Sequence, residues 1–326
     1  MQAVTARART FLLVGAVAIA AAAAVVAITA ATSEKTPGTA AAGPQSRPGV
    51  PPLSLDLGVR TDREAVDLRE AVRLYDEGKR AAAERLFARH GSLEARIGES
   101  FSRWPDGTLA RLTQLSGLHP KSAAVQLNLG IARFWAGEDG AKDAWQSAAT
   151  LQPDTAYAVT AGNLLHPEFA RNLPVFVPTA EVPAAVRRLP APAQLALLRR
   201  RAAGGSVSDR LFYGVALQRL GKQRSAEKVY AAAARSAPGD AEAQVAAAVG
   251  LFSKDRPVRA FSSLGPLTRK FPGSASVRFH LGLLLLWSGE VKQARRQLEL
   301  VGKVEPGSSL VPVARQYLET LRKAGV

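Results

Sequence analysis

A repeat of 34 residues in the C-terminal half of the chain limits its possible folds more than any other feature of the sequence. With this period, the same kinds of residue fall in register in three successive copies. The columns are Leu217, Leu251 and Leu285; Ala226, Ala260 and Ala294; Pro238, Pro272 and Pro306; Gly239, Gly273 and Gly307; Gly214, Ala248 and Gly282; and Tyr230, Leu264 and Leu298. Each copy is therefore expected to form the same local structure and to bury its apolar face against the next copy.

The pattern within each copy predicts two helices. Small residues such as Gly214 and Ala226 allow two antiparallel helices to approach closely, whereas bulky residues there would separate them. The Pro-Gly pair ends the second helix, because proline cannot continue the helical hydrogen-bond ladder. Alanine dominates the apolar 47% of the chain and aromatic residues make up only 6%, which favours helices over strands. The predicted fold class is all-α.

Over about residues 207–308 this pattern resembles the tetratricopeptide repeat, a 34-residue unit of helix, turn and helix. The resemblance implies a right-handed α-solenoid in which the first helix of each repeat lines a concave face. The family's tryptophan in the first helix is replaced by Arg210, Gln244 and Arg278. Asp255 replaces the turn glycine that the neighbouring copies have at Gly221 and Gly289.

The same pattern is looser upstream, and it divides the rest of the folded chain. Residues 61–153 are predicted to form degenerate repeats of this kind, and residues 154–206 a repeat with a proline-rich insertion around His166 to Arg188. Residues 207–326 then comprise three regular repeats and a capping helix from Leu310 to Leu321, since solenoids require caps.

Residues 1–31 are expected to form a cytoplasmic tip and one transmembrane helix. From Phe11 to Ala31 the only polar group is the hydroxyl of Thr29, and such a helix spans roughly 31 Å, close to the bilayer core. Arg7 and Arg9 precede the span, so the positive-inside rule places the N-terminus in the cytoplasm and the repeats outside it. A signal peptide that is cleaved, with secretion of the rest, is the alternative.

Residues 32–60 are rich in proline, alanine and glycine and are predicted to be a disordered linker. As a flexible coil its ends would lie on the order of 30 Å apart, which would lift the repeats clear of the membrane surface.

The chain carries a net charge of +16, which favours anionic partners such as lipid headgroups or cell-wall polymers. The only dense basic run is Arg199, Arg200 and Arg201, close to Arg187 and Arg188, and the other Lys and Arg residues are scattered. Nucleic-acid binding is not favoured, because it requires clustered basic residues with aromatic or amide side chains. The absence of cysteine excludes disulfides and thiol chemistry.

No catalytic residue, cofactor site or metal site is predicted, and we expect a protein that is not an enzyme. The histidines, His90, His119, His166 and His280, are far apart in a sequence whose repeats contact only their neighbours. His280 lies in an apolar run and is expected to be a core residue. An active site in the insertion near His166 and Glu168 is a minor alternative.

The predicted partner site is the concave groove. Residues four and three apart on one helix share a face, and three first helices then present one stripe. Its apolar members are Leu211, Val215, Val245, Val249, Phe252, Phe279, Leu283 and Leu286, and its ninth member is Gln218. The stripe suits an amphipathic helix or an extended apolar segment, unless the proline-rich insertion already covers it.

These features together predict a membrane-tethered, extracytoplasmic scaffold for protein–protein interaction, whose partner the sequence does not identify. The alternative function is a basic adhesion module for anionic lipid or cell-wall polymer.

Overall fold

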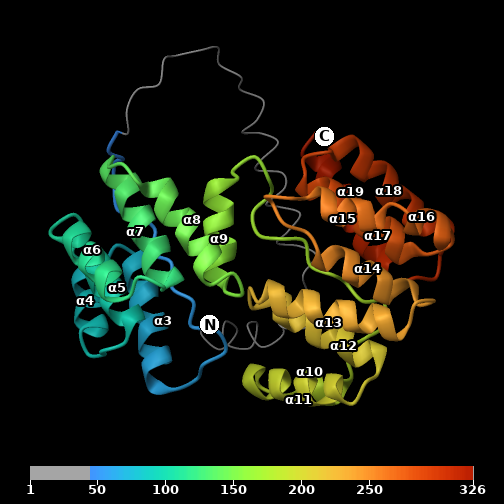
Figure 1. Ribbon diagram of the computed structural model, residues 1–326, viewed down its shortest axis with the longest axis horizontal. Helices are drawn as coiled ribbons and strands as arrows, with labels where there is room; N and C mark the ends of the chain where they lie inside the picture. The colour runs from blue at the N-terminus through green and yellow to red at the C-terminus, as the bar shows by residue number, and fades with distance from the viewer. Residues whose placement is uncertain (1–44, 326) are drawn as a thin grey trace, which may run out of the picture. The chain divides into compact units, whose positions relative to one another are not determined.

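The computed structural model describes residues 45–325 (Figure 1), so the predicted transmembrane helix and residues 32–44 of the predicted linker lie outside the described residues. The described residues form helices, turns and extended segments, with no strand among them, which confirms the all-α class. None of these helices is long and apolar enough to cross a membrane. The chain divides into an N-terminal unit that ends at Leu165 and a C-terminal unit that begins at His166.

The described part of the N-terminal unit begins with an extended segment and continues with helices that pack as consecutive hairpins. The helices are α3 (Arg63–Asp76), α4 (Arg80–Phe87), α5 (Leu93–Ser102), α6 (Thr108–Leu118), α7 (Ala123–Ala136), α8 (Ala141–Leu151) and α9 (Ala156–Leu165). Helix α3 packs on α4, α7 on α8, and α8 on α9.

The C-terminal unit also begins with an extended segment, and its helices include those of the three regular repeats. The helices are α10 (Ala184–Arg187), α11 (Ala191–Ala203), α12 (Val207–Arg219), α13 (Gln223–Ser236), α14 (Ala241–Gly250), α15 (Val258–Leu264), α16 (Leu267–Lys270), α17 (Ala275–Trp287), α18 (Val291–Val304) and α19 (Leu310–Lys323). The first helices of the repeats are α12, α14 and α17, which begin 34 residues apart as predicted.

The first helices begin at the same place in each repeat because each has a capping side chain. Ser206, Asp240 and Ser274 accept a hydrogen bond from the backbone N–H three residues later, at 3.0, 2.9 and 3.4 Å. Such a cap typically contributes about 1 kcal/mol. The capping residue directly follows the Pro-Gly pair in the second and third repeats, so one short segment ends one helix and starts the next.

The two helices of a repeat approach closely at a glycine in the first helix. A Cβ built on Gly214 would lie 2.2 Å from the ring of Tyr230, and one on Gly282 would lie 2.9 Å from Leu298. The small-residue column of the sequence therefore packs beneath the bulky column. In the N-terminal unit Gly130 makes the equivalent contact, where a Cβ would lie 2.5 Å from the ring of Trp145.

The middle repeat differs from its neighbours where Asp255 replaces the turn glycine. Gly221 and Gly289 have φ of 69° and 78°, the left-handed region that favours glycine. Without it, α14 ends at Gly250, earlier in its repeat than α12 and α17, and an irregular segment leads into α15. The second helix is also divided into α15 and α16, where Pro266 follows Gly265.

Two predicted boundaries differ from the structure. The segment 154–206 does not form one repeat, because α9 belongs to the N-terminal unit whereas α11 packs on α12. The predicted linker reaches residue 60, yet Leu53, Leu55 and Leu57 pack against the core of the N-terminal unit.

The contact between Gly214 and Tyr230 yields a stability prediction. Replacing Gly214 with alanine should lower the free energy of unfolding by about 1–3 kcal/mol, because the added methyl group overlaps the buried ring. Gly239→Ala is the matched control, since a Cβ there meets no atom within 4 Å. Urea denaturation measures both variants, and equal stability would contradict this packing.

Candidate functional site

The eight residues of the predicted groove lie in one place, but they are not exposed. Leu211, Val215, Val245, Val249, Phe252, Phe279, Leu283 and Leu286 are all at most 3% exposed and belong to one hydrophobic core. Ala170 and Phe176, from the extended segment that opens the C-terminal unit, are buried in the same core. The structure therefore shows a groove that the proline-rich insertion fills, which is one of the two arrangements that the sequence allows.

The segment that fills the groove spans residues 167–182, and we name it the strap. Its backbone N–H groups donate hydrogen bonds to side chains from the three first helices. The Phe176 N–H donates to Gln218 Oε1 at 3.0 Å, that of Val177 to His280 Nε2 at 2.9 Å, and that of Thr179 to Glu242 Oε1 at 2.7 Å. Residue 178 is a proline and has no N–H to satisfy. The run 176–179 thus has all its donors paired inside the groove.

The Phe176 side chain is the apolar anchor of the strap. It is fully buried, its ring stacks on His280 with 4.8 Å between ring centroids, and it meets Tyr230 edge to face at 5.8 Å. The Tyr230 hydroxyl in turn donates to Gln218 Oε1 at 2.9 Å, and the Gln218 amide donates to the Pro174 carbonyl at 3.4 Å. His280 therefore both accepts from the strap backbone and stacks on its aromatic ring, and Tyr230 connects the ring to Gln218.

Burial fixes the protonation state that the His280 contact needs. Desolvation lowers the pKa of His280 to about 4, so the ring is neutral and its Nε2 can accept the Val177 N–H. The Nδ1 atom, 2.7 Å from the Ser276 carbonyl oxygen, then carries the proton and donates. Burial raises the pKa of the Glu242 carboxyl and also that of the Tyr230 hydroxyl. The site offers acceptors to an extended backbone, and its walls are apolar.

Further contacts fix the two ends of the strap. The Ala170 N–H donates to the Trp287 carbonyl at 3.3 Å, and the Ser309 hydroxyl donates to the Thr179 carbonyl at 2.8 Å. Just before the strap, His166 Nε2 lies 2.7 Å from an Asp255 carboxylate oxygen, and its Nδ1 lies 3.2 Å from Glu168. The residues of the minor enzyme alternative thus belong to a cluster of polar contacts on the surface, at the entry to the strap.

The N-terminal unit repeats this arrangement with residues 45–58. Asn128 on α7 is fully buried and holds Ser54 from both sides: its Oδ1 accepts the Ser54 N–H at 3.1 Å, and its Nδ2 donates to the Ser54 carbonyl at 2.8 Å. The Asp56 N–H donates to the Tyr157 hydroxyl at 2.9 Å, and the Tyr75 hydroxyl donates to the Pro51 carbonyl at 2.6 Å. Each unit thus covers its own first helices with an extended segment.

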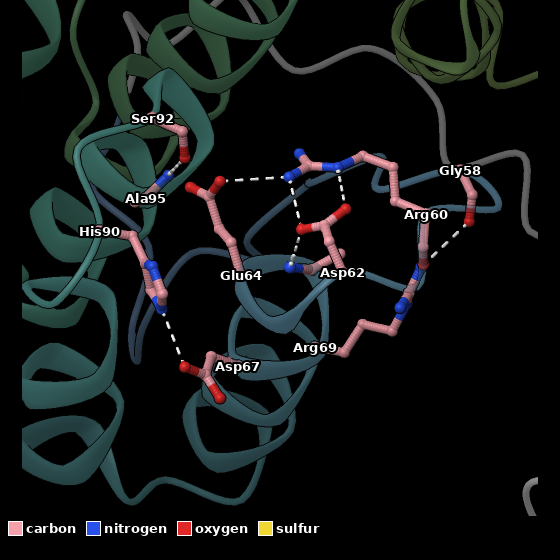
Figure 2. A network of polar contacts seen from close by, with 10 residues as sticks. Gly58, Arg60, Asp62, Glu64, Asp67, Arg69, His90, Ser92 and Ala95 are labelled. Atoms are coloured by element: carbon pink, nitrogen blue, oxygen red, sulfur yellow. Dashed lines mark hydrogen bonds and ion pairs between the residues drawn. The ribbon is translucent and has the colours of Figure 1, made fainter.

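A surface network fixes the turn from this segment into α3 (Figure 2). The guanidinium of Arg60 donates to both oxygens of Asp62 at 2.8 and 2.9 Å and to Glu64 at 3.1 Å. Asp62 also caps α3 by accepting the Ala65 N–H at 3.0 Å. Arg69 donates to the Arg60 carbonyl at 2.6 Å. These charges are partly exposed to solvent, so we assign the network a role in orienting the chain rather than in stability.

The polar residues that hold the strap were not among the predicted site residues. Gln218, Glu242 and His280 occupy three different positions of the 34-residue repeat, so aligning the repeats does not bring them together. One signal was present, because Gln218 was the only polar member of the predicted apolar stripe. A buried amide on an apolar helix face needs partners, and an extended backbone provides them.

The buried His280 yields a pH prediction. Its pKa in the folded state, about 4, is below the ordinary 6.5, so the stability it contributes is complete above pH 6.5 and is lost as the pH falls toward 4. The loss from this residue should be roughly 3 kcal/mol. His280→Gln retains an acceptor but does not titrate. The unfolding free energy of the variant should therefore fall less steeply between pH 6.5 and 4, and parallel curves would contradict the assignment.

Comparison with known proteins yields solved structures only. No protein-family model and no curated protein matches the sequence. The chain is similar to a tetratricopeptide repeat protein of Parabacteroides merdae, with 13% identity and a TM-score of 0.34 over 79% of this chain and 98% of that one. It is also similar to a tetratricopeptide repeat protein of Thermus thermophilus, with 16% identity and a TM-score of 0.27 over 79% and 99% of the two chains. For yeast Tom70 the values are 13% and 0.31, over 84% and 66%.

Because these identities and TM-scores are low, the evidence for the repeat is the packing of the helix pairs in this chain. Helices α12, α14 and α17 begin at the predicted 34-residue spacing, and each is followed by a second helix that packs against it. The structure thus confirms the helix-turn-helix repeats that the resemblance to the tetratricopeptide repeat predicts.

Proposed function

We propose that this chain is a membrane-tethered, extracytoplasmic scaffold for protein–protein interaction, in which the C-terminal groove takes an extended segment of a partner in place of the strap. The observation that carries the proposal is the set of hydrogen bonds from the strap backbone to Gln218, His280 and Glu242. A groove that holds its own chain in this way has the acceptors and the aromatic pocket that a partner segment would need.

The contacts also specify the kind of segment that fits. Most of the polar contacts are to backbone N–H groups, which every residue except proline can supply. The side-chain requirement falls mainly on one position, where a ring enters between Tyr230 and His280. The preferred partner is therefore an extended, apolar segment with one aromatic residue, and not the amphipathic helix that an open groove would also accommodate.

The strap would make this binding conditional. Because the strap is part of the same chain, its effective concentration at the groove is on the order of millimolar, and a partner segment has to compete with it. The apparent affinity of the partner falls by the fraction of molecules whose groove is open. Any change that releases the strap should therefore strengthen partner binding.

The membrane part of the proposal rests on the sequence alone. The apolar stretch from Phe11 to Ala31 and the preceding Arg7 and Arg9 favour a single span with the repeats outside the cytoplasm. The alternative is export followed by cleavage of this segment. The extended segment packs on the N-terminal unit from Arg47, whose N–H donates to the Trp135 carbonyl at 2.8 Å, so the proposed tether would be shorter than residues 32–60.

A peptide in trans tests the groove. A fluorescent peptide with the sequence of residues 172–180 should bind the full-length Phe176→Ala chain, whose strap has lost its anchor, at least tenfold more tightly than the unaltered chain. The measurement is fluorescence anisotropy, with circular dichroism to verify the fold.

Two controls make the result specific. The same peptide with alanine in place of its phenylalanine should bind neither chain, and adding Gln218→Leu to the Phe176→Ala chain should abolish binding of the original peptide, because the acceptor for the peptide N–H is lost. Equal binding of the two peptides would contradict the proposal.

A protease experiment tests the topology. Protease added to intact cells without their wall should digest the repeats and leave roughly the first 30 residues in the membrane fraction. Protection of the repeats in intact cells would mean that they lie in the cytoplasm, opposite to the proposed orientation. Recovery of a chain that begins near residue 32 from the medium would instead support secretion after cleavage.

A further inference from the structure

The net positive charge of the chain is concentrated in the C-terminal unit. Residues 166–326 contain 25 Lys or Arg and 11 Asp or Glu, a net charge of +14, whereas residues 45–165 contain 15 of each. Two units of the same repeat type therefore differ sharply in charge. A general need for solubility does not explain a difference of this size within one chain.

Within the C-terminal unit, the charge lies on the second helices. The segments 222–236, 256–270 and 291–304, which contain α13, α15, α16 and α18, hold 12 Lys or Arg and two Glu. The first helices of the same repeats, α12, α14 and α17, hold three basic and two acidic residues. The side chains that accept hydrogen bonds from the strap backbone lie on the first helices, and the second helices contribute the buried Tyr230 to the groove. The basic residues of the second helices lie on their exposed side, away from that buried ring. We name the exposed side of these second helices the basic face.

Several side chains of the basic face are available to a ligand. Arg235, Arg269 and Lys303 recur at the 34-residue period, are exposed, and have no acidic partner among the described residues. Each lies in the last turn of its helix, where the helix dipole favours a cation. The dipole alone is therefore a sufficient reason for a basic residue at each of these three positions. It does not account for exposed Lys228 or Arg296 in the middle of α13 and α18, which also lack an acidic partner in the described part of the chain.

The chemistry of the basic face suits a bilayer surface better than a nucleic acid. Binding of single-stranded nucleic acid uses aromatic side chains on which bases stack, and the large apolar residues exposed in the described part of the chain are valines and leucines. One of them, Val258, is 63% exposed at the start of α15, between Arg256 and Arg259 in the sequence. An apolar side chain flanked by arginines can enter the headgroup region while the guanidinium groups meet lipid phosphates.

We infer that the basic face binds the anionic phospholipid headgroups of the membrane to which the chain is tethered. The inference rests on the proposed tether, which would hold the C-terminal unit close enough to the bilayer for charge to act over the Debye length of about 8 Å. Docking by the second helices would leave the strap and its groove free for a partner.

Energy transfer from the protein to labelled lipid tests the inference. The chain has no cysteine, so Ser262→Cys on α15 gives one site for a fluorescent donor. The full-length chain is reconstituted into phosphatidylcholine vesicles that contain a headgroup-labelled acceptor, with or without phosphatidylglycerol. Transfer should increase with phosphatidylglycerol and should decrease at high salt, because exposed charges are screened.

A matched pair of triple variants separates the basic face from net charge. Replacing Arg235, Arg269 and Lys303 with glutamine should weaken docking at least tenfold, since each basic residue near an anionic surface contributes about fivefold. Replacing exposed Arg85, Arg89 and Lys142 of the N-terminal unit with glutamine removes the same charge and should have no comparable effect. Equal loss in the two variants would overturn the inference, as would transfer that does not depend on phosphatidylglycerol.

Two further readings distinguish the possible failures. If the chain does not co-float with neutral phosphatidylcholine vesicles, the proposed tether is wrong. Co-flotation of the same variants with vesicles that contain phosphatidylglycerol then tests the basic face without the tether. If the first triple variant loses binding to a DNA duplex but keeps binding to anionic vesicles, the face is a nucleic-acid surface and the inference is overturned.

Discussion

Backbone N–H groups that are buried away from water need acceptors, and in this chain that requirement shapes the groove. The strap crosses an apolar surface, where an unpaired N–H would cost about 1–3 kcal/mol. Gln218, His280 and Glu242 supply the acceptors, and the prolines at 174 and 178 remove donors at two further positions. The polar residues of the groove are therefore explained by the segment that lies in it.

The close helix pairs provide the rigid surface on which this depends. Gly214 and Gly282 let a bulky side chain of the second helix lie against the backbone of the first, and the caps at Ser206, Asp240 and Ser274 start each first helix in register. The acceptors are therefore held on fixed helices. The strap has no secondary structure of its own, and its conformation depends on the helices beneath it.

The sequence predicted the repeated elements well and the non-repeated ones poorly. The columns that include Gly214, Pro238 and Tyr230 predicted the helix pairs of the C-terminal unit, because packing and turn formation impose the same residues in every copy. The helical spacing also placed the predicted partner residues on one stripe, but it did not decide whether the groove was covered. Whether the groove is covered depends on contacts between residues more than 40 positions apart, such as the hydrogen bond from Phe176 to Gln218. Such contacts leave no periodic signal in the sequence. Within the three regular repeats, the Lys and Arg residues look scattered along the sequence but lie largely on the second helices, which only the helix assignments reveal.

The two units apply one solution to the same problem, since each covers its first helices with an extended segment and holds it with a buried amide, Asn128 or Gln218. Hydrogen exchange followed by NMR tests this account most directly, at the amides of Phe176, Val177 and Thr179. A strap docked in the groove predicts protection of these three amides close to that of the core amides of α14 and α17. Exchange at the rate of a free loop, while the helices stay protected, would contradict it.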